Sequence, residues 1–464
     1  MKAWEIRQPG LGIGGLLLRV DWVLVILLGL VATVGFAMLY SAGGGDIRPW
    51  AGPHVLRFTA GLAVMIGVAL IDIRFWLFCA YPIYAAGLLL VIGVEFVGDI
   101  GMGAQRWLKL GPLSVQPSEV MKIALVLALA RHFHALDERE VGRWPMLLLA
   151  LVLIAAPVLL VAQQPDLGTA VMIATGGAAM LFMGGLPLWV FALFATAGGT
   201  LVPAVWYSLK DYQRDRILTF LDPERDLAGA GYHGYQSKVG IGSGGEFGKG
   251  YLEGTQSHLG FLPESHTDFI FTVVSEEFGL AGGLFVLALY LAIIGYGFAI
   301  GFMARNNFGR LLAFGVTFTF FLFVFVNIAM VAGLIPVVGV PLPFISYGGT
   351  AMLTLQFGFG LVLSAKVHRE VEMDEDGEAP ARWARDGSRR CVAPLQALLR
   401  GHARKPEQQA GHAPPAAAHQ GVAGNRGCGA DRTLLDPLQR SRRAEGRRAR
   451  PRRLWRRASV DADN

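Results

Sequence analysis

Residues 20–41 of this chain read VDWVLVILLGLVATVGFAMLYS, and no charged residue follows Asp21 within the run. An α-helix needs about 20 consecutive apolar residues to cross about 30 Å of hydrocarbon. Similar runs recur along the 464 residues between short charged segments. Only 16% of the residues are charged and the mean hydropathy is +0.46, whereas a soluble domain carries about 25% charged residues. The sequence therefore predicts an integral membrane protein.

The apolar runs between charged residues give ten candidate spans. Arg and Lys gather beside alternate span ends, as at Arg74, Arg131 and Arg305, and the positive-inside rule places these ends and both termini in the cytoplasm. We therefore expect an all-α polytopic protein of about ten transmembrane helices, with a large extracytoplasmic loop at 209–268 between spans seven and eight. The predicted spans are roughly 20–41, 55–71, 75–95, 115–131, 145–163, 168–185, 187–208, 269–303, 311–334 and 349–366.

The net charge of +6 belongs to the C-terminal end of the chain. Residues 379–464 hold 19 of the 41 Lys and Arg and 7 of the 35 Asp and Glu, so residues 1–378 carry a net charge of −6. This distribution argues against nucleic-acid binding by the body. We expect a ten-span body at 1–368 and a disordered cytoplasmic tail at 369–464, because the tail lacks an apolar period. The tail could bind anionic lipid, or it could be GC-rich coding sequence read past its natural stop or out of frame.

Two polar clusters lie at the starts of spans four and six, where ionisable residues often mark function. In PSEVMK, residues 117–122, Glu119 and Lys122 are three apart and share a helix face. They could serve function or hold the helix end at the interface. In QQPDLGT, residues 163–169, Asp166 could serve function or only cap the next helix.

Two further clusters lie in the long loop. The glycine-rich run 240–250 has backbone amides that could face phosphate, or it could be a flexible loop. The stretch LPESHTDFIF, residues 262–271, enters span eight and places Asp268 beside Glu264 and His266. A carboxylate at this position could be a general base, or Thr267 or Asp268 could merely cap the helix.

These clusters, taken together and in order, resemble the SEDS family (shape, elongation, division and sporulation), whose members polymerise lipid II into glycan strands. The resemblance covers residues 15–368, and the stretch 248–264 is similar to the elongation member rather than the division member. It rests on QPSE (116–119) with Lys122, QPDLG (164–168), PE (263–264) with HTDFIF (266–271), and PFISYGG (343–349).

The resemblance implies an essential catalytic carboxylate at Asp268, a functional pair at Glu119 and Lys122, and an important acid at Asp166. Glu264 and His266 flank the carboxylate as supporting groups. The implied reaction is peptidoglycan glycosyl transfer at the outer face of the bacterial cytoplasmic membrane. The 4-hydroxyl of one lipid II attacks the anomeric carbon at the end of the growing chain, with inversion and release of undecaprenyl diphosphate.

The departing diphosphate requires positive charge, and no cofactor or metal-ligand spacing is apparent, although a divalent cation is compatible with the chemistry. The implied partners are lipid II, a class B penicillin-binding protein and other elongation-complex membrane proteins.

A lipid II transporter is the rival function, because helices broken near Asp166 and Pro343 would suit a transport path. The candidates gather on one face, which favours an enzyme, and a pure scaffold would leave the outer carboxylates without a role. The predicted outer-face cations are Arg106, Lys109, Lys122, Arg216, Lys238 and Lys249.

Overall fold

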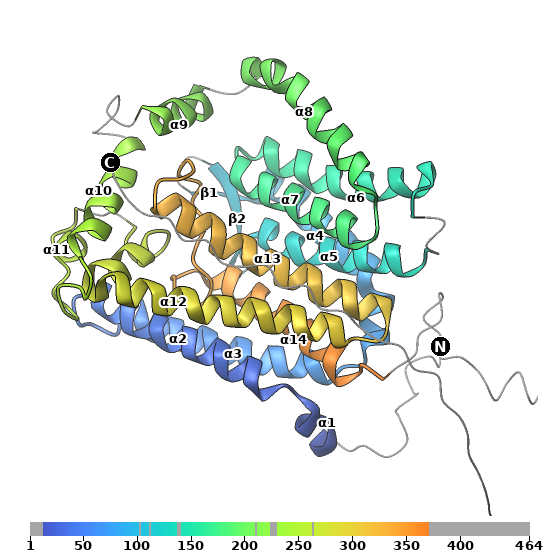
Figure 1. Cartoon of the computed structure of the whole chain (residues 1–464), viewed down its shortest axis with the longest axis horizontal. Coiled ribbons are helices and arrows are strands. Elements are labelled where there is room, and N and C mark those ends of the chain that lie inside the picture. Colours follow the sequence, from blue (N-terminus) through green and yellow to red (C-terminus); the bar gives the residue numbers. More distant parts are fainter. Residues whose placement is uncertain are drawn as a thin grey trace, which may run out of the picture. The chain divides into compact units, whose positions relative to one another are not determined.

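The computed structural model describes residues 13–370, except for 102–103, 111–112, 137–140, 209–210, 223–229 and 262–263. The predicted tail at 369–464 lies outside the described residues from 371 onward, so its disorder stays a prediction. Within the described part, long helices dominate, and α2, α3, α12, α13 and α14 run side by side (Figure 1). The fold is that of a helical, multi-pass membrane protein.

Each of the ten predicted spans coincides with a long helix. Seven of these helices (α2, α3, α4, α6, α12, α13 and α14) are long and apolar enough to cross a membrane. Of the other three, α5 carries charged residues and α7 has 17 residues, so the count of ten crossings stays a prediction. The ten helices are α2 Trp22–Ala42, α3 Ala51–Leu70, α4 Ile73–Val97, α5 Pro117–His134, α6 Trp144–Gln163, α7 Leu167–Met183, α8 Leu188–Ser208, α12 Ile270–Met303, α13 Asn307–Val331 and α14 Gly349–Val367.

Shorter elements occupy the remaining segments. The predicted all-α fold did not include a small antiparallel sheet in the order β1-β2-β3, which forms between α4 and α5. The predicted long loop contains α9, α10 and α11, and α10 packs against α12 and α13. These elements are α1 Ile13–Arg19, β1 Asp99–Gly101, β2 Ala104–Leu110, β3 Leu113–Val115, α9 Asp211–Leu221, α10 Ala230–Ser243 and α11 Thr255–His258.

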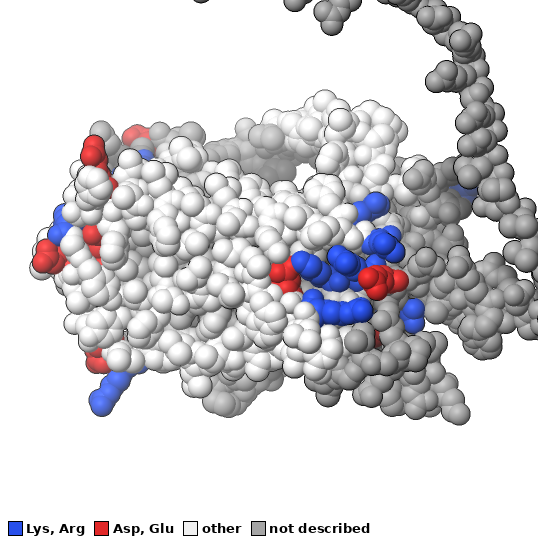
Figure 2. All heavy atoms as spheres, turned by 60° about the horizontal axis from the view of Figure 1, so that its bottom comes forward, with Lys and Arg blue, Asp and Glu red and all other residues white. Residues whose placement is uncertain are grey.

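Charged side chains gather at the two ends of the face shown in Figure 2, with a broad band of other residues between them. One such end includes the start of α2 and the end of α14, where Lys366 forms an ion pair with Asp21 and Arg19 lies 3.9 Å from Glu370. Because charge is costly in hydrocarbon and stable at its edges, this distribution fits a protein whose middle faces lipid.

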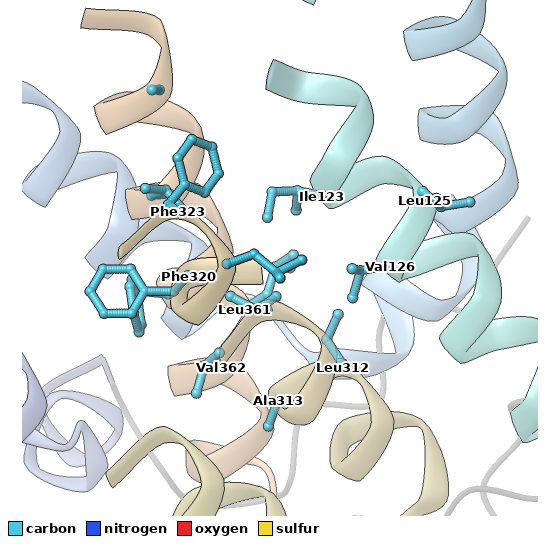
Figure 3. Packing of buried hydrophobic residues seen from close by; sticks show 14 of the residues in the cluster. Ile123, Leu125, Val126, Leu312, Ala313, Phe320, Phe323, Leu361 and Val362 are labelled. Atoms are coloured by element: carbon cyan, nitrogen blue, oxygen red, sulfur yellow. The ribbon is translucent and has the colours of Figure 1, made fainter. Parts of the chain in front are cut away.

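The core lies around α13, which contacts α5, α7, α12 and α14. Phe320 and Phe323 of α13 pack near Ile123 of α5 and Leu361 of α14 (Figure 3). Close packing of this kind holds membrane helices together where lipid removes the usual hydrophobic drive. Helix α13 ends at Val331, and the segment 332–348 that follows it leads to α14 through the region where the candidate site lies.

Candidate functional site

Asp268 lies in the turn that immediately precedes α12. The N-cap residue of that helix is Phe269, which makes no side-chain capping bond, and Thr267 donates its hydroxyl to Glu264 instead. Neither of the two predicted capping residues therefore caps α12. The capping explanation for Asp268 is wrong, because the helix begins two residues beyond it.

The Asp268 carboxyl lies against the segment 332–348. A Cβ atom built on Gly339 would stand 3.3 Å from Asp268 Oδ2, and the backbone oxygen of Asp268 accepts a hydrogen bond of 2.8 Å from Asn327 Nδ2. Burial, together with the smaller effect of the negative charge on Glu264, raises the pKa of Asp268 to about 6. A carboxyl with this pKa is largely ionised at neutral pH and can accept a proton there.

Glu264 and His266 support the same turn. Glu264 Oε2 accepts a 2.9 Å hydrogen bond from Thr267 Oγ1 and lies 3.9 Å from His266 Nε2. The His266 ring stacks on Trp50, the N-cap residue of α3, with centroids 4.2 Å apart, and the His266 backbone oxygen accepts a bond of 2.9 Å from the amide of Tyr347. Burial lowers the pKa of His266, while Glu264 opposes that shift. The turn is thus held between α3 and the segment before α14.

Glu119 and Lys122 form the predicted pair in the first turns of α5. Lys122 Nζ donates to Glu119 Oε1 at 2.8 Å and lies 3.9 Å from the centroid of the Phe323 ring. Both residues are buried, with 6% and 5% of their surface exposed. A buried cation next to an aromatic face requires its counter-ion. The predicted pairing is present, and the pair joins α5 to α13.

Asp166 caps α7 and also meets Arg106 from β2. Its Oδ1 accepts a bond of 3.3 Å from the Thr169 amide and lies 3.9 Å from Arg106 Nη1. Arg106 also donates to the backbone oxygens of Gln164, at 3.3 Å, and Pro165. The capping role of Asp166 is therefore present together with an ion pair, which fastens the sheet to the turn between α6 and α7.

The segment 332–348 brings these parts together. Gly168, at the start of α7, leaves no room for a Cβ because Val338 occupies that space, and the next residue of the segment, Gly339, faces Asp268. Thr350, just past the segment, donates to the backbone oxygen of Ser114 in β3 at 3.0 Å. The predicted extracytoplasmic loop at 209–268 and the segments 96–114 and 335–348 thus contact one another directly or through α7 and α14, as far as the structure describes them.

The glycine run packs against α12 rather than presenting its amides outward. Gly279 interrupts α12 with a φ of +65°, and Gly248, at +83°, lies so close that a Cβ would overlap the Glu277 backbone oxygen. The Lys249 amide bonds to the Glu276 oxygen at 3.0 Å, and the Gly250 amide bonds to the Glu277 oxygen at 3.1 Å. The phosphate hypothesis for these two amides is wrong, because α12 uses them, whereas the flexible-loop alternative stays a prediction for a run that is packed at Gly248.

The predicted diphosphate cations have different surroundings. Lys249 Nζ donates to the buried Glu276 carboxylate at 2.6 Å and to Thr255 at 2.7 Å, so the contacts of Lys249 give no support to its predicted role. Lys238 is exposed and its side chain crosses Gly333 at the end of α13. Lys109 lies on β2 opposite Ser114, whereas the Arg216 side chain lies outside the described residues.

Sequence reasoning missed Asn327, a buried polar residue in the run FLFVFVNIAM of α13. A lone amide in an apolar span is costly, and this was the signal available. It also missed Trp50, and it quoted Tyr347 only within the motif PFISYGG; the contacts of both residues with His266 depend on the tertiary fold. Among the described residues, no group of three or more His, Cys, Asp or Glu is placed to hold a metal ion.

Comparisons with known proteins agree on one family. Residues 16–371 match FTSW_RODA_SPOVE, described as cell cycle protein. The peptidoglycan glycosyltransferase MrdB of Escherichia coli (strain K12) is 51% identical over 278 residues, which cover 59% of this chain and 74% of that protein. The probable peptidoglycan glycosyltransferase FtsW of Trichlorobacter lovleyi is 37% identical over 274 residues, covering 58% and 70%.

Two solved structures are similar along nearly their whole length. A chain from a peptidoglycan synthase complex, described for its structural coordination of polymerization and crosslinking, has a TM-score of 0.68 and 33% identity, covering 76% of this chain and 99% of that one. The rod shape determining protein RodA of Thermus thermophilus has a TM-score of 0.57 and 30% identity, covering 76% and 98%.

Proposed function

The chain belongs to the FtsW/RodA/SpoVE family of cell cycle proteins, and we propose that it polymerises lipid II with Asp268 as the general base. It is a peptidoglycan glycosyltransferase, as its similarity to MrdB over most of that protein indicates. The observation that carries the assignment of Asp268 is its setting: a largely buried carboxyl with a pKa of about 6, packed on the segment 332–348 and unused as a helix cap.

The proposed step is an inverting glycosyl transfer. The Asp268 carboxylate accepts the proton of the 4-hydroxyl on the N-acetylglucosamine of one lipid II, and that oxygen attacks C1 of the lipid-linked N-acetylmuramic acid. The bond from C1 to the diphosphate oxygen breaks, and undecaprenyl diphosphate leaves with the bonding electrons. A positioned base accelerates such a step by about 10² to 10⁴, because a sugar hydroxyl is a poor nucleophile.

The leaving diphosphate requires positive charge close to the departing oxygen. Arg106 is the predicted cation that the described contacts favour, since its side chain is 28% exposed and lies in the cluster that Asp166 and segment 332–348 define. Lys122 is buried and neutralised by Glu119, and we assign that pair the role of fixing α5 against α13 beneath the site. Lys109 and Lys238 remain further candidates for this role.

We place the enzyme in the bacterial cytoplasmic membrane, with both termini in the cytoplasm and Asp268 at the outer face. This orientation follows the distribution of Arg and Lys along the chain. The partner is a class B penicillin-binding protein that cross-links the new strands, as part of an elongation complex. The similarity to a chain from a synthase complex for polymerization and crosslinking supports this proposal.

The purified full chain in proteoliposomes, with labelled lipid II, tests the proposed reaction. We expect glycan strands longer than two disaccharides, and more of them when the class B partner is added. A transporter would move lipid II between leaflets, which a membrane-impermeant label detects, without forming any strand. Transport without polymer, with and without the partner, would overturn the proposed function.

A further inference from the structure

We propose that Asn327 is a positioning residue for Asp268: its buried amide fixes the backbone on both sides of the carboxylate and so sets where the base stands. This inference rests on the proposed function, because it concerns the same carboxylate. Asn327 itself does not touch the reacting atoms. It acts through two backbone contacts, one in the turn before α12 and one in the segment 332–348.

The two contacts are short and well defined. Asn327 Nδ2 donates to the backbone oxygen of Asp268 at 2.8 Å and to the backbone oxygen of Val340 at 2.6 Å. Both partners can only accept, so the NH₂ group and not the oxygen of the amide must face them. Asn327 has 0% of its surface exposed, and within the described part of the chain its Oδ1 accepts no hydrogen bond. Donation to these two oxygens is therefore what the side chain does.

The geometry couples these contacts to the carboxylate. Val340 follows Gly339, and Gly339 is the residue whose Cα faces Asp268 Oδ2. One amide thus joins the Asp268 backbone, 59 residues before Asn327, to the Val340 backbone, 13 residues after it. The Val340 backbone lies next to Gly339 and so beside the Asp268 side chain. Without that amide, the buried Val340 carbonyl and the partly buried Asp268 carbonyl lose this donor and move apart or recruit water. Either response shifts the Asp268 carboxylate relative to the segment 332–348, against which it packs.

The reaction is sensitive to such a shift. A general base must stand within about 2.6–3.2 Å of the proton-bearing oxygen, and a misplacement of about 1 Å can lower the rate about 10²-fold. A buried polar residue near the end of an apolar helix is also costly unless it serves a purpose. Simple helix–helix adhesion would be another purpose, and it makes a different prediction.

The same helix supplies a matched control. Asn306 caps the other end of α13, is 6% exposed, and accepts a 2.6 Å bond from the Gly309 amide. Asn306→Leu and Asn327→Leu each remove one buried amide, at opposite ends of α13. We expect both variants to lower the melting temperature of the purified full chain, since each leaves backbone groups without their partner. Only the Asn327 variant should affect catalysis by the protein that remains folded.

The experiment measures kcat and KM for labelled lipid II, per folded protein, at pH 5 to 8. Positioning predicts that kcat of Asn327→Leu falls roughly tenfold to a hundredfold, that KM stays within about twofold, and that the acidic limb of the pH profile moves. Asn327→Ala, which is smaller and folds more readily, should behave in the same way. If either folded variant keeps the kcat and pH profile of Asn306→Leu, Asn327 contributes to stability alone and the inference is wrong.

Asp268→Asn in the same assay separates this inference from the proposed function. Loss of polymer in Asp268→Asn, with unchanged kcat in the Asn327 variants, overturns positioning and leaves the general base intact. Wild-type polymerisation by Asp268→Asn overturns the general base, and the positioning role with it. A lower kcat in Asp268→Asn and in the Asn327 variants supports both the general base and the positioning role.

Discussion

The buried pair of Glu119 and Lys122 allows a quantitative test. The two charged atoms are 2.8 Å apart, and the side chains are only 7% and 4% exposed. Lys122→Met would leave the Glu119 carboxylate uncompensated, and Glu119→Gln would leave the Lys122 ammonium against the Phe323 ring. Removing one partner of a buried pair costs about 3–5 kcal/mol. The double variant strands no charge, so we expect it to cost less than the sum of the two single changes by at least about 2 kcal/mol.

The assay is a double-mutant cycle on the free energy of unfolding in detergent micelles, with polymerisation measured on the folded fraction. The pair Arg19 and Glu370 is the matched control, because its atoms are 3.9 Å apart and its side chains are 39% and 51% exposed. Its coupling should lie within about 0–1 kcal/mol. The reasoning fails if the stability cost of the double variant equals the sum of the two single costs to within about 0.5 kcal/mol. Glu119 and Lys122 would then not act as a buried unit.

Three further predictions concern other parts of the chain. Deleting 379–464 should leave insertion and polymerisation unchanged, and loss of activity at normal membrane levels would show that the tail is needed. Polymerisation should fall as pH drops below about 6, approaching tenfold per pH unit, because protonated Asp268 cannot accept the hydroxyl proton; an equal rate at pH 5 and 7 would contradict this. Gly248→Ala should destabilise the protein by at least about 1–3 kcal/mol, because Gly248 has a positive φ and its Cβ would overlap the Glu277 backbone oxygen. Gly242→Ala, with open space around it, should not destabilise the protein. Thermal melts of the two variants test this difference.

The helices could be predicted from the sequence because a long apolar run indicates a helix that lies in lipid or in the protein core. The run predicted at 311–334, for example, has apolar residues on all sides, and most of it becomes α13 at the buried centre of the bundle. The turn at 264–268 was also predictable, since Pro263, the charged residues and the apolar run after them mark a helix entry. What the sequence could not choose was the function of that entry, because Asp serves equally well as a cap or as a base.

The contacts that build the site were beyond sequence patterns. Asn327 meets Asp268 from 59 residues away, and His266 stacks on Trp50 from far along the chain. Neither contact has a local period or spacing that would reveal it. The glycines near Gly248 were ambiguous for a different reason: glycine permits flexibility, phosphate contact and close backbone packing alike. Only the position of α12 shows that close packing is the use made of them here.

The most direct test of the account is polymerisation of labelled lipid II by Asp268→Asn. The substitution keeps the shape of the side chain but cannot accept the hydroxyl proton. The folded protein binds the Asp268 proton more tightly than its ordinary pKa of 3.8 implies, so ionisation costs stability as pH rises from about 4 to about 6. Removing that charge should leave the melting temperature at pH 7 unchanged or higher.

The account therefore predicts a well-folded, inserted Asp268→Asn protein that binds lipid II and forms at least about 10²-fold less glycan than the wild type. Glu246→Gln, which neutralises an exposed carboxylate in the same loop, should polymerise normally. Near-normal glycan synthesis by Asp268→Asn, at equal membrane level and melting temperature, would contradict the central claim.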